Sequence, residues 1–172
     1  MRVDILPLES CDAEHIVKWN DGKDSDFLTQ WAGRGYHHPI TAIQIKKRIA
    51  QQLSSDYELY KIVGNGFVIG TIELMQIDLE AKRANVGRFL LDPALTGKGH
   101  GTAALREFIT RMFAEKPLEK IGLTVFEFNL AAIRCYRKTG FEVIDKKNRP
   151  NGWVAVEMEI TNKEELCDEN SQ

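Results

Sequence analysis

The chain has 172 residues, of which 43% are hydrophobic and 28% are charged, which is ordinary for one globular domain that can bury its own core. Its net charge of −2 argues against nucleic acid as a partner, and it lacks a signal-peptide pattern and any run of about 18 apolar residues, which argues against a membrane partner. Its three widely spaced cysteines form no C-x-x-C pair, which argues against a disulfide framework or a metal site and favours a cytoplasmic location.

The hydrophobic pattern predicts an α/β (α+β) fold with a mixed, mostly antiparallel seven-stranded sheet and about four helices. Short apolar or alternating segments, typical of strands, lie at residues 2–6, 57–63, 67–76, 83–91, 121–126, 141–146 and 153–160. Apolar residues recur at helical spacing at residues 12–20, 41–53, 99–114 and 129–139. Residues 1–160 are expected to form a single domain, followed by a disordered acidic tail at 161–172.

Two features of the first third of the chain bear on function. The segment 27–39 follows a polar loop at 21–26, has no clear periodicity and carries Trp31 and Tyr36. Rigid aromatic side chains often shape a substrate pocket, but they also pin a loop to the core, and both interpretations stay open. In the helix that follows, Lys46, Lys47 and Arg48 are interpreted as an outward, solvated face.

The stretch from Phe89 to Leu105 is the most informative part of the sequence. An apolar strand ends at Pro93, three alternating glycines follow (Gly97, Gly99 and Gly101), and a helical pattern begins directly after them. The first turn of a helix has backbone N–H groups without internal partners and a partial positive charge. Glycines let a ligand approach that backbone, so this stretch predicts an anion site, most plausibly for phosphate.

Two common nucleotide motifs do not fit these glycines. A Walker A loop needs Ser or Thr after its Gly-Lys pair, whereas Lys98 is followed by Gly99. The dinucleotide motif G-x-G-x-x-G is one residue longer than the spacing found, and Thr102 stands where its third glycine belongs. A plain turn with a helix cap remains the simplest alternative.

A second block, from Asn129 to Phe141, indicates which kind of phosphate site the glycine turn forms. Taken with residues 88–105, it resembles the acetyl-CoA-binding core of the GNAT superfamily of N-acetyltransferases, whose second motif has Asn, Ala, Tyr and then Gly-Phe. The matching residues are Asn129, Ala132, Tyr136, Gly140 and Phe141. The first motif, Q/R-x-x-G-x-G/A, is kept at Gly99 and Gly101 but departs at Thr96. The resemblance covers about residues 57–160, and it is strongest to ribosomal-protein-type and small-amine acetyltransferases.

The resemblance implies a site for acetyl-CoA as cosubstrate, in a sheet that splays apart there. Backbone amides of the turn would hold the pyrophosphate, and its residues are Gly97, Lys98, Gly99, His100, Gly101 and Thr102. The strand Phe89, Leu90 and Leu91 would pair with the acyl-pantetheine arm, where one free amide can polarise the thioester carbonyl. Asn129 would bond pantetheine, although Asn at this position also caps a helix.

In this family a tyrosine protonates the departing thiolate, which implies Tyr136 as the acid; a packed helix tyrosine is the alternative. Cys135 points elsewhere on the helix and is interpreted as core. The base is less clear, because Asn85 stands where many members carry Glu. Glu73 is the first candidate, since an isolated carboxylate in an apolar strand is expensive, but it would equally form an ion pair with Arg88. Glu127 and water are the other candidates.

The sequence therefore predicts an acetyl-CoA-dependent N-acetyltransferase that moves the acetyl group directly to a primary amine. A catalytically weak acyl-CoA-binding module with a sensing role is the alternative, and a kinase-like nucleotide protein is disfavoured. Trp31, Tyr36 and Asn85 are the expected acceptor-site residues. The sequence pattern does not distinguish a small-molecule acceptor from a peptide. Acidic residues around the site would favour a cationic acceptor. A monomer or homodimer is expected.

Overall fold

The computed structural model describes residues 1–163, which form one seven-stranded sheet and five α-helices. The strands are β1 (Val3–Pro7), β2 (Glu58–Gly64), β3 (Phe67–Asp78), β4 (Arg83–Leu91), β5 (Lys120–Phe126), β6 (Glu142–Asn148) and β7 (Val154–Thr161). The helices are α1 (Ala13–Trp19), α2 (Ser25–Ala32), α3 (Ala42–Gln51), α4 (His100–Glu115) and α5 (Leu130–Thr139). None of these helices is long and apolar enough to cross a membrane.

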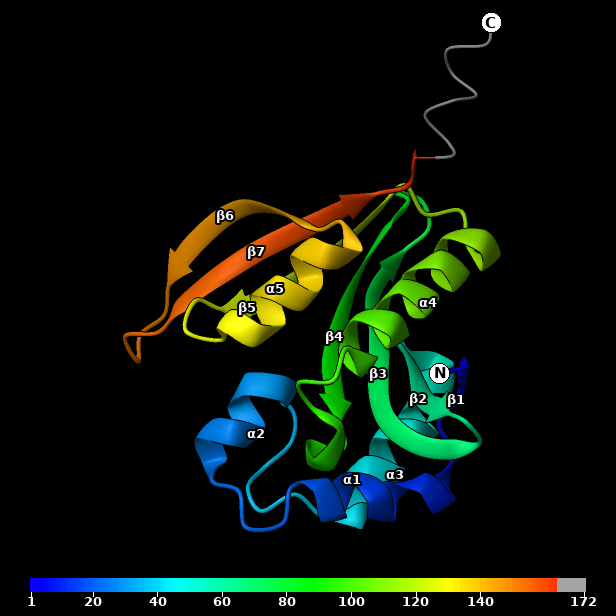
Figure 1. The fold of residues 1–172 in the computed structure, drawn as a ribbon, viewed down its shortest axis with the longest axis vertical. Helices are drawn as coiled ribbons and strands as arrows, with labels where there is room; N and C mark the ends of the chain where they lie inside the picture. The colour runs from blue at the N-terminus through cyan, green and yellow to red at the C-terminus, as the bar shows by residue number, and fades with distance from the viewer. Residues whose placement is uncertain (164–172) are drawn as a thin grey trace, which may run out of the picture.

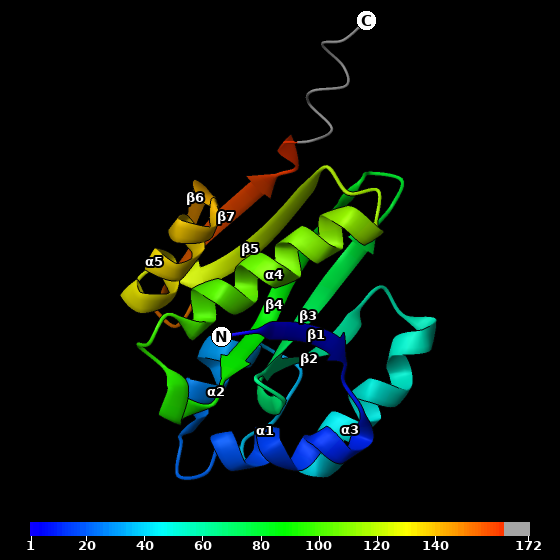
Figure 2. The ribbon, with the colours of Figure 1, turned by 45° about the vertical axis from the view of Figure 1, so that its right-hand side comes forward.

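The sheet order is β1-β2-β3-β4-β5-β7-β6, and every neighbouring pair is antiparallel except β4 and β5. Helices α4 and α5 lie over one face of the sheet, while α1, α2 and α3 lie at its other side (Figures 1 and 2). Each side has its own apolar cluster. One contains Phe108 and Met112 of α4, and the other contains Trp19 of α1, Leu28 of α2 and Ile45 of α3.

The parallel pair β4–β5 is the irregular place in this sheet. Pairing starts at Arg83 with Lys120 and stops at Asn85 with Gly122, although both strands continue beyond it. From Val86 onward β4 pairs only with β3, so the two strands diverge toward the C-terminal end of β4 (Figure 1). The backbone groups of this part of β4 that face away from β3 have no strand partner, which leaves them available to a ligand.

The fold class predicted from the sequence, including the splayed sheet, is confirmed, with two corrections. Residues 25–32, expected as polar loop and irregular chain, form helix α2, because Asp24 caps it by accepting a hydrogen bond from the N–H of Phe27, and Leu28 and Ala32 are buried on one face. Thr161, expected to open the tail, is the last residue of β7. The tail from residue 164 onward lies outside the described residues.

We expect Phe108→Ala to destabilise the protein by about 3–5 kcal/mol, because this fully buried ring packs edge-on against Tyr60, with ring centres 5.5 Å apart, and its loss leaves a cavity. Urea unfolding measures the change. The exposed Glu107→Ala on the same helix is the control and should shift the free energy of unfolding by no more than about 0.5 kcal/mol. Equal midpoints for the two variants would show that α4 does not support the core.

Candidate functional site

The glycine turn, residues 97–102, joins β4 to α4. Gly97 and Gly99 have φ angles of +76° and +82°, and Gly99 is the residue before the first turn of the helix. A Cβ at either glycine would meet no atom within 4 Å, so the left-handed backbone, and not crowding, requires glycine there. Among the described residues, no backbone N–H from Gly97 to Thr102 donates a hydrogen bond. The turn therefore presents a series of free donors at the positive end of a 16-residue helix.

Close packing holds this turn against β4 and α5. A Cβ at Gly101 would lie 3.4 Å from a Leu91 methyl and 3.7 Å from the sulfur of Cys135. The Thr102 hydroxyl donates to that sulfur at 3.6 Å. Phe89 and Leu91 point to the α4 side of the sheet, whereas Leu90 lies in the cluster of the other side. The predicted pyrophosphate turn and pantetheine strand are thus brought together with α5.

A β-bulge interrupts β4 immediately before this strand segment. Thr71 of β3 pairs with Leu90 and Glu73 pairs with Gly87, so Arg88 and Phe89 together face the single residue Ile72. Arg88 has a φ of +45°, which an arginine rarely adopts. Bulges twist and re-aim a strand, and strained residues of this kind persist only where the surroundings fix them.

An ion-pair cluster of Glu73, Arg48 and Arg88 holds the strained backbone at Arg88 in place. The Glu73 carboxylate is 2% exposed and accepts from Arg48, with Nε–Oε1 at 2.9 Å and Nη2–Oε2 at 2.7 Å. Arg88 Nη1 lies 3.3 Å from Glu73 Oε2. The predicted ion pair of Glu73 with Arg88 is therefore present, and Arg48 is a second partner. Both oxygens of this carboxylate accept from guanidinium groups, so the geometry leaves neither oxygen free for an amine and argues against Glu73 as the base.

Arg88 also fixes the end of α2. Its Nε donates to the carbonyl of Ala32 at 3.0 Å and its Nη2 to the carbonyl of Arg34 at 2.8 Å. The guanidinium lies 4.9 Å from the ring centre of Tyr36, and burial together with the nearby Glu73 raises the pKa of that tyrosine. Gly35 is required here because a Cβ would lie 2.3 Å from Arg88 Nη2.

A cavity of about 540 Å³ opens beside the bulge, between the end of α2, the diverging β4 and β5, and the turn from β6 to β7. Its lining residues are Thr29, Gln30, Trp31, Ala32, Gly33, Arg34, Met75, Gln76, Asn85, Val86, Gly87, Arg88, Thr124, Phe126, Arg149, Pro150 and Asn151. Two of the predicted acceptor-site residues, Trp31 and Asn85, line it. The third, Tyr36, does not line it but packs against Trp31, with ring centres 6.1 Å apart.

Helix α5 carries the other two predicted site residues. Asn129 caps it by accepting a hydrogen bond from the N–H of Ala132 at 3.3 Å, which is the capping role that the sequence offered for it. The Tyr136 ring is half-buried and packs edge-on against Phe141. Its hydroxyl has no hydrogen-bond partner within residues 1–163. Burial raises its pKa, so the phenol keeps its proton at neutral pH.

Comparison with known proteins decides the family. The profile described as "Acetyltransferase (GNAT) domain" matches residues 2–142. The chain belongs to the GNAT acetyltransferase family. It is 31% identical over 152 residues to the probable N-acetyltransferase YjcK of Bacillus subtilis, covering 84% of this chain and 83% of that protein.

Two solved structures share the fold of this acetyltransferase. One is a spermidine N-acetyltransferase from Vibrio cholerae in complex with CoA and spermine, with a TM-score of 0.80 and 17% identity over 95% of this chain and 98% of that chain. The other is an aminoglycoside acetyltransferase in complex with coenzyme A, with a TM-score of 0.76 and 23% identity over 94% of this chain and 96% of that chain. The predicted superfamily and enzyme class are thereby confirmed.

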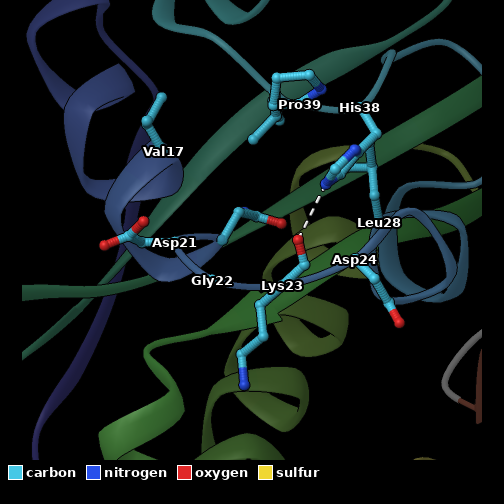
Figure 3. Close-up of a pocket in the computed structure, with 10 residues that line it drawn as sticks. Val17, Asp21, Gly22, Lys23, Asp24, Leu28, His38 and Pro39 are labelled. Carbon is cyan, nitrogen blue, oxygen red and sulfur yellow. Dashed lines mark hydrogen bonds between the residues drawn. The ribbon is translucent and has the colours of Figure 1, made fainter.

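A second cavity of this acetyltransferase, of about 340 Å³, lies between α1, the start of α2 and residues 38–40 (Figure 3). There His38 Nε2 lies 2.9 Å from the carbonyl oxygen of Lys23 (Figure 3). None of its lining residues belongs to β4, β5 or the glycine turn. The first cavity is therefore the candidate for acetyl transfer, because it alone of the two borders the bulge and the diverging strands.

Sequence reasoning missed three arginines of the site. Arg48 was assigned to a solvated face, which is wrong: it binds Glu73. The helical spacing indicates an inward position for Arg48, because it lies three residues after the buried Ile45 and so shares that face of α3. Arg34 and Arg149 line the cavity from two loops that are distant in the chain, and no sequence pattern indicated that they meet.

We expect Glu73→Gln to lower the free energy of unfolding by about 3 kcal/mol, because it leaves two largely buried guanidiniums without a counter-charge. Chemical denaturation measures this. Glu119→Gln is the matched control: it removes a carboxylate from a half-exposed pair with Lys82 and should change stability by less than about 1 kcal/mol. If the two variants are equally stable, the buried cluster does not hold the site together.

Proposed function

We propose that this acetyltransferase uses acetyl-CoA and transfers the acetyl group directly to a primary amine of a small molecule or a peptide. One observation carries the proposal: the free N–H donors of the glycine turn and the cavity beside the bulge lie at the same divergence of β4 and β5. An anion-binding helix terminus next to a cavity between splayed strands suits a long phosphorylated cosubstrate and a separate acceptor.

The residues present fit CoA. The backbone amides of Gly97 to Thr102 would hold the pyrophosphate, since they are unbonded and no side chain covers Gly97 or Gly99. The unpaired edge of β4 at Phe89 to Leu91 would hold the pantetheine arm by strand-like hydrogen bonds. Asn129 would contact the arm while keeping its capping bond, because an amide oxygen has two lone pairs.

Acetyl-CoA would supply an activated acyl group, and the chain's own groups would direct it. The Tyr136 hydroxyl would donate its proton to the leaving sulfur, a role supported by its raised pKa and by the lack of a hydrogen bond to any residue from 1 to 163. Cys135 would take no part, since burial raises the pKa of its thiol despite the hydrogen bond that the sulfur accepts from Thr102.

Water would accept the proton of the amine. None of the described residues that line the cavity is Asp, Glu or His. Glu73 is held by Arg48 and Arg88, and Glu127 is exposed, paired with Lys146 at 2.7 Å and not part of the lining. The cavity opens to solvent, so a proton can leave along water without a dedicated side chain.

We expect Gly99→Ala to weaken CoA binding, because alanine at φ +82° costs about 1 kcal/mol or more and distorts the series of N–H donors. Isothermal titration of CoA into the variant measures the effect. Ala103→Gly, at an exposed position one turn into the same helix, is the control for a general loss of helix stability. Unchanged CoA affinity in Gly99→Ala would refute the placement of the pyrophosphate.

We expect Tyr136→Phe to lower kcat by about 100-fold while acetyl-CoA affinity stays nearly the same, because only the proton donor is removed. Release of CoA thiol, with a set of primary amines as acceptors, measures kcat. Cys135→Ala, at the neighbouring position, should retain activity if transfer is direct. A fully active Tyr136→Phe would exclude the acid role, and an absence of turnover in the parent protein would favour the non-catalytic binding module.

A further inference from the structure

The cavity beside the bulge is unusual in its charge. Its lining includes three arginines, Arg34, Arg88 and Arg149, and no carboxylate among the described residues. A pocket that receives a polyamine or an aminoglycoside needs negative groups to balance the cation, because a like charge nearby repels it. The charged side chains of this cavity wall are instead positive.

The buried cluster beneath the cavity does not cancel that charge. Among the described residues, Glu73 is the only carboxylate paired with Arg48 and Arg88, so two guanidiniums share one negative charge and the cluster keeps one positive charge. Arg88 is itself part of the lining, and its side chain is fixed by the carbonyls of Ala32 and Arg34. The positive potential therefore comes from a rigid part of the site.

Arg34 and Arg149 are exposed, and neither has an ion-pair partner within the described part of the chain. Their backbones are nevertheless held. The carbonyl of Arg34 accepts from Arg88, and the N–H of Arg149 donates to the carbonyl of Trp153 at 2.7 Å. Trp153 in turn packs edge-on against Phe126 of β5, with ring centres 4.8 Å apart. Two arginines from loops that are distant in the chain, neither in an ion pair with a described residue, thus line one cavity.

Two carboxylates of β7 and the β5–α5 connection are engaged by lysines of β6. Glu127 pairs with Lys146, and Glu157 pairs with Lys147 at 2.8 Å. The large apolar side chains of the wall are Trp31, Phe126 and Met75. The cavity thus combines apolar walls with unpaired guanidiniums, a combination that recognises carboxylate or phosphate groups.

We infer that the acceptor is a primary amine that also carries a negatively charged group, a carboxylate or a phosphate, which Arg34 and Arg149 bind while the amine faces the diverging strands. This inference rests on the proposed function and adds the substrate class. Polyamines and aminoglycosides, which the names of the structural neighbours suggest, are disfavoured acceptors of this chain.

Matched amines test the inference. β-Alanine is compared with its neutral amide, and phosphoethanolamine with ethanolamine, so that one pair isolates a carboxylate and the other a phosphate; spermidine is the cationic probe. The protein variants are Arg34→Ala, Arg149→Ala and the double variant, with Arg2→Ala, an exposed arginine of the opposite sheet edge, as control. CoA-thiol release gives kcat and KM, and heat protection of the CoA-loaded protein gives amine binding independently of turnover.

We expect one or both charged members to exceed their neutral partners in kcat/KM by about tenfold, since each exposed ion pair contributes up to about fivefold. The advantage should lie in KM, shrink at 0.5 M salt because exposed charges are screened, and disappear in the double variant but not in Arg2→Ala. Preference for spermidine, an advantage that survives in the double variant, or weakened acetyl-CoA binding in place of weakened acceptor binding would overturn the inference.

The proposed function and this inference fail in different ways. If no amine is acetylated, the proposed function is wrong, and heat protection still decides the charge preference of the cavity. Protection by phosphoethanolamine or β-alanine in the parent protein, absent in the double variant, would support the inference even then. Equal protection by charged and neutral partners would overturn it.

Discussion

A single buried carboxylate, Glu73, connects the strands of the site to the helices that close it. It binds Arg48 of α3 and Arg88 of β4, and Arg88 binds the carbonyls at the end of α2. Buried charges are expensive unless each is paired, so these elements form the cluster together or not at all. The bulge at Arg88 depends on it, since the left-handed backbone there is held by four hydrogen bonds of its own side chain, two of them to Glu73, and by a contact with the Tyr36 ring.

The bulge in turn explains why the sheet opens where it does. Two residues of β4 face one residue of β3 at Ile72, which re-aims the strand just after its last pairing with β5 at Asn85. The divergence leaves one side of Phe89 to Leu91 without a strand partner, and the cavity is lined by the residues that precede them in β4, Asn85 to Arg88. One stretch of β4 thus borders both the edge proposed to hold the cosubstrate and the cavity proposed to hold the acceptor.

The sequence predicted the parts of this arrangement that are local in the chain. Helix α4, the glycine turn and the α5 cap at Asn129 follow from periodicity, from positive φ and from capping, which need only neighbouring residues. Helix α2 was missed because eight residues with only two buried positions carry little periodicity. The Glu73 cluster was foreseen only as a pair with Arg88, because Arg48 joins it across 25 positions and no short-range pattern encodes that contact.

The same distinction between local and long-range contacts separates the half of the candidate site that suits CoA from the half proposed for the acceptor. The half that suits CoA consists of backbone N–H groups and glycines within one stretch, so its chemistry follows family membership closely. The acceptor half consists of side chains from α2, β3, β4, β5 and the turn from β6 to β7. Each of those elements can exchange a surface side chain without disturbing the Glu73 cluster, so the sign of charge in the cavity is free to differ between relatives of one fold. We therefore propose that the charge of this cavity, and not the acceptors named for its structural neighbours, indicates the acceptor of this chain.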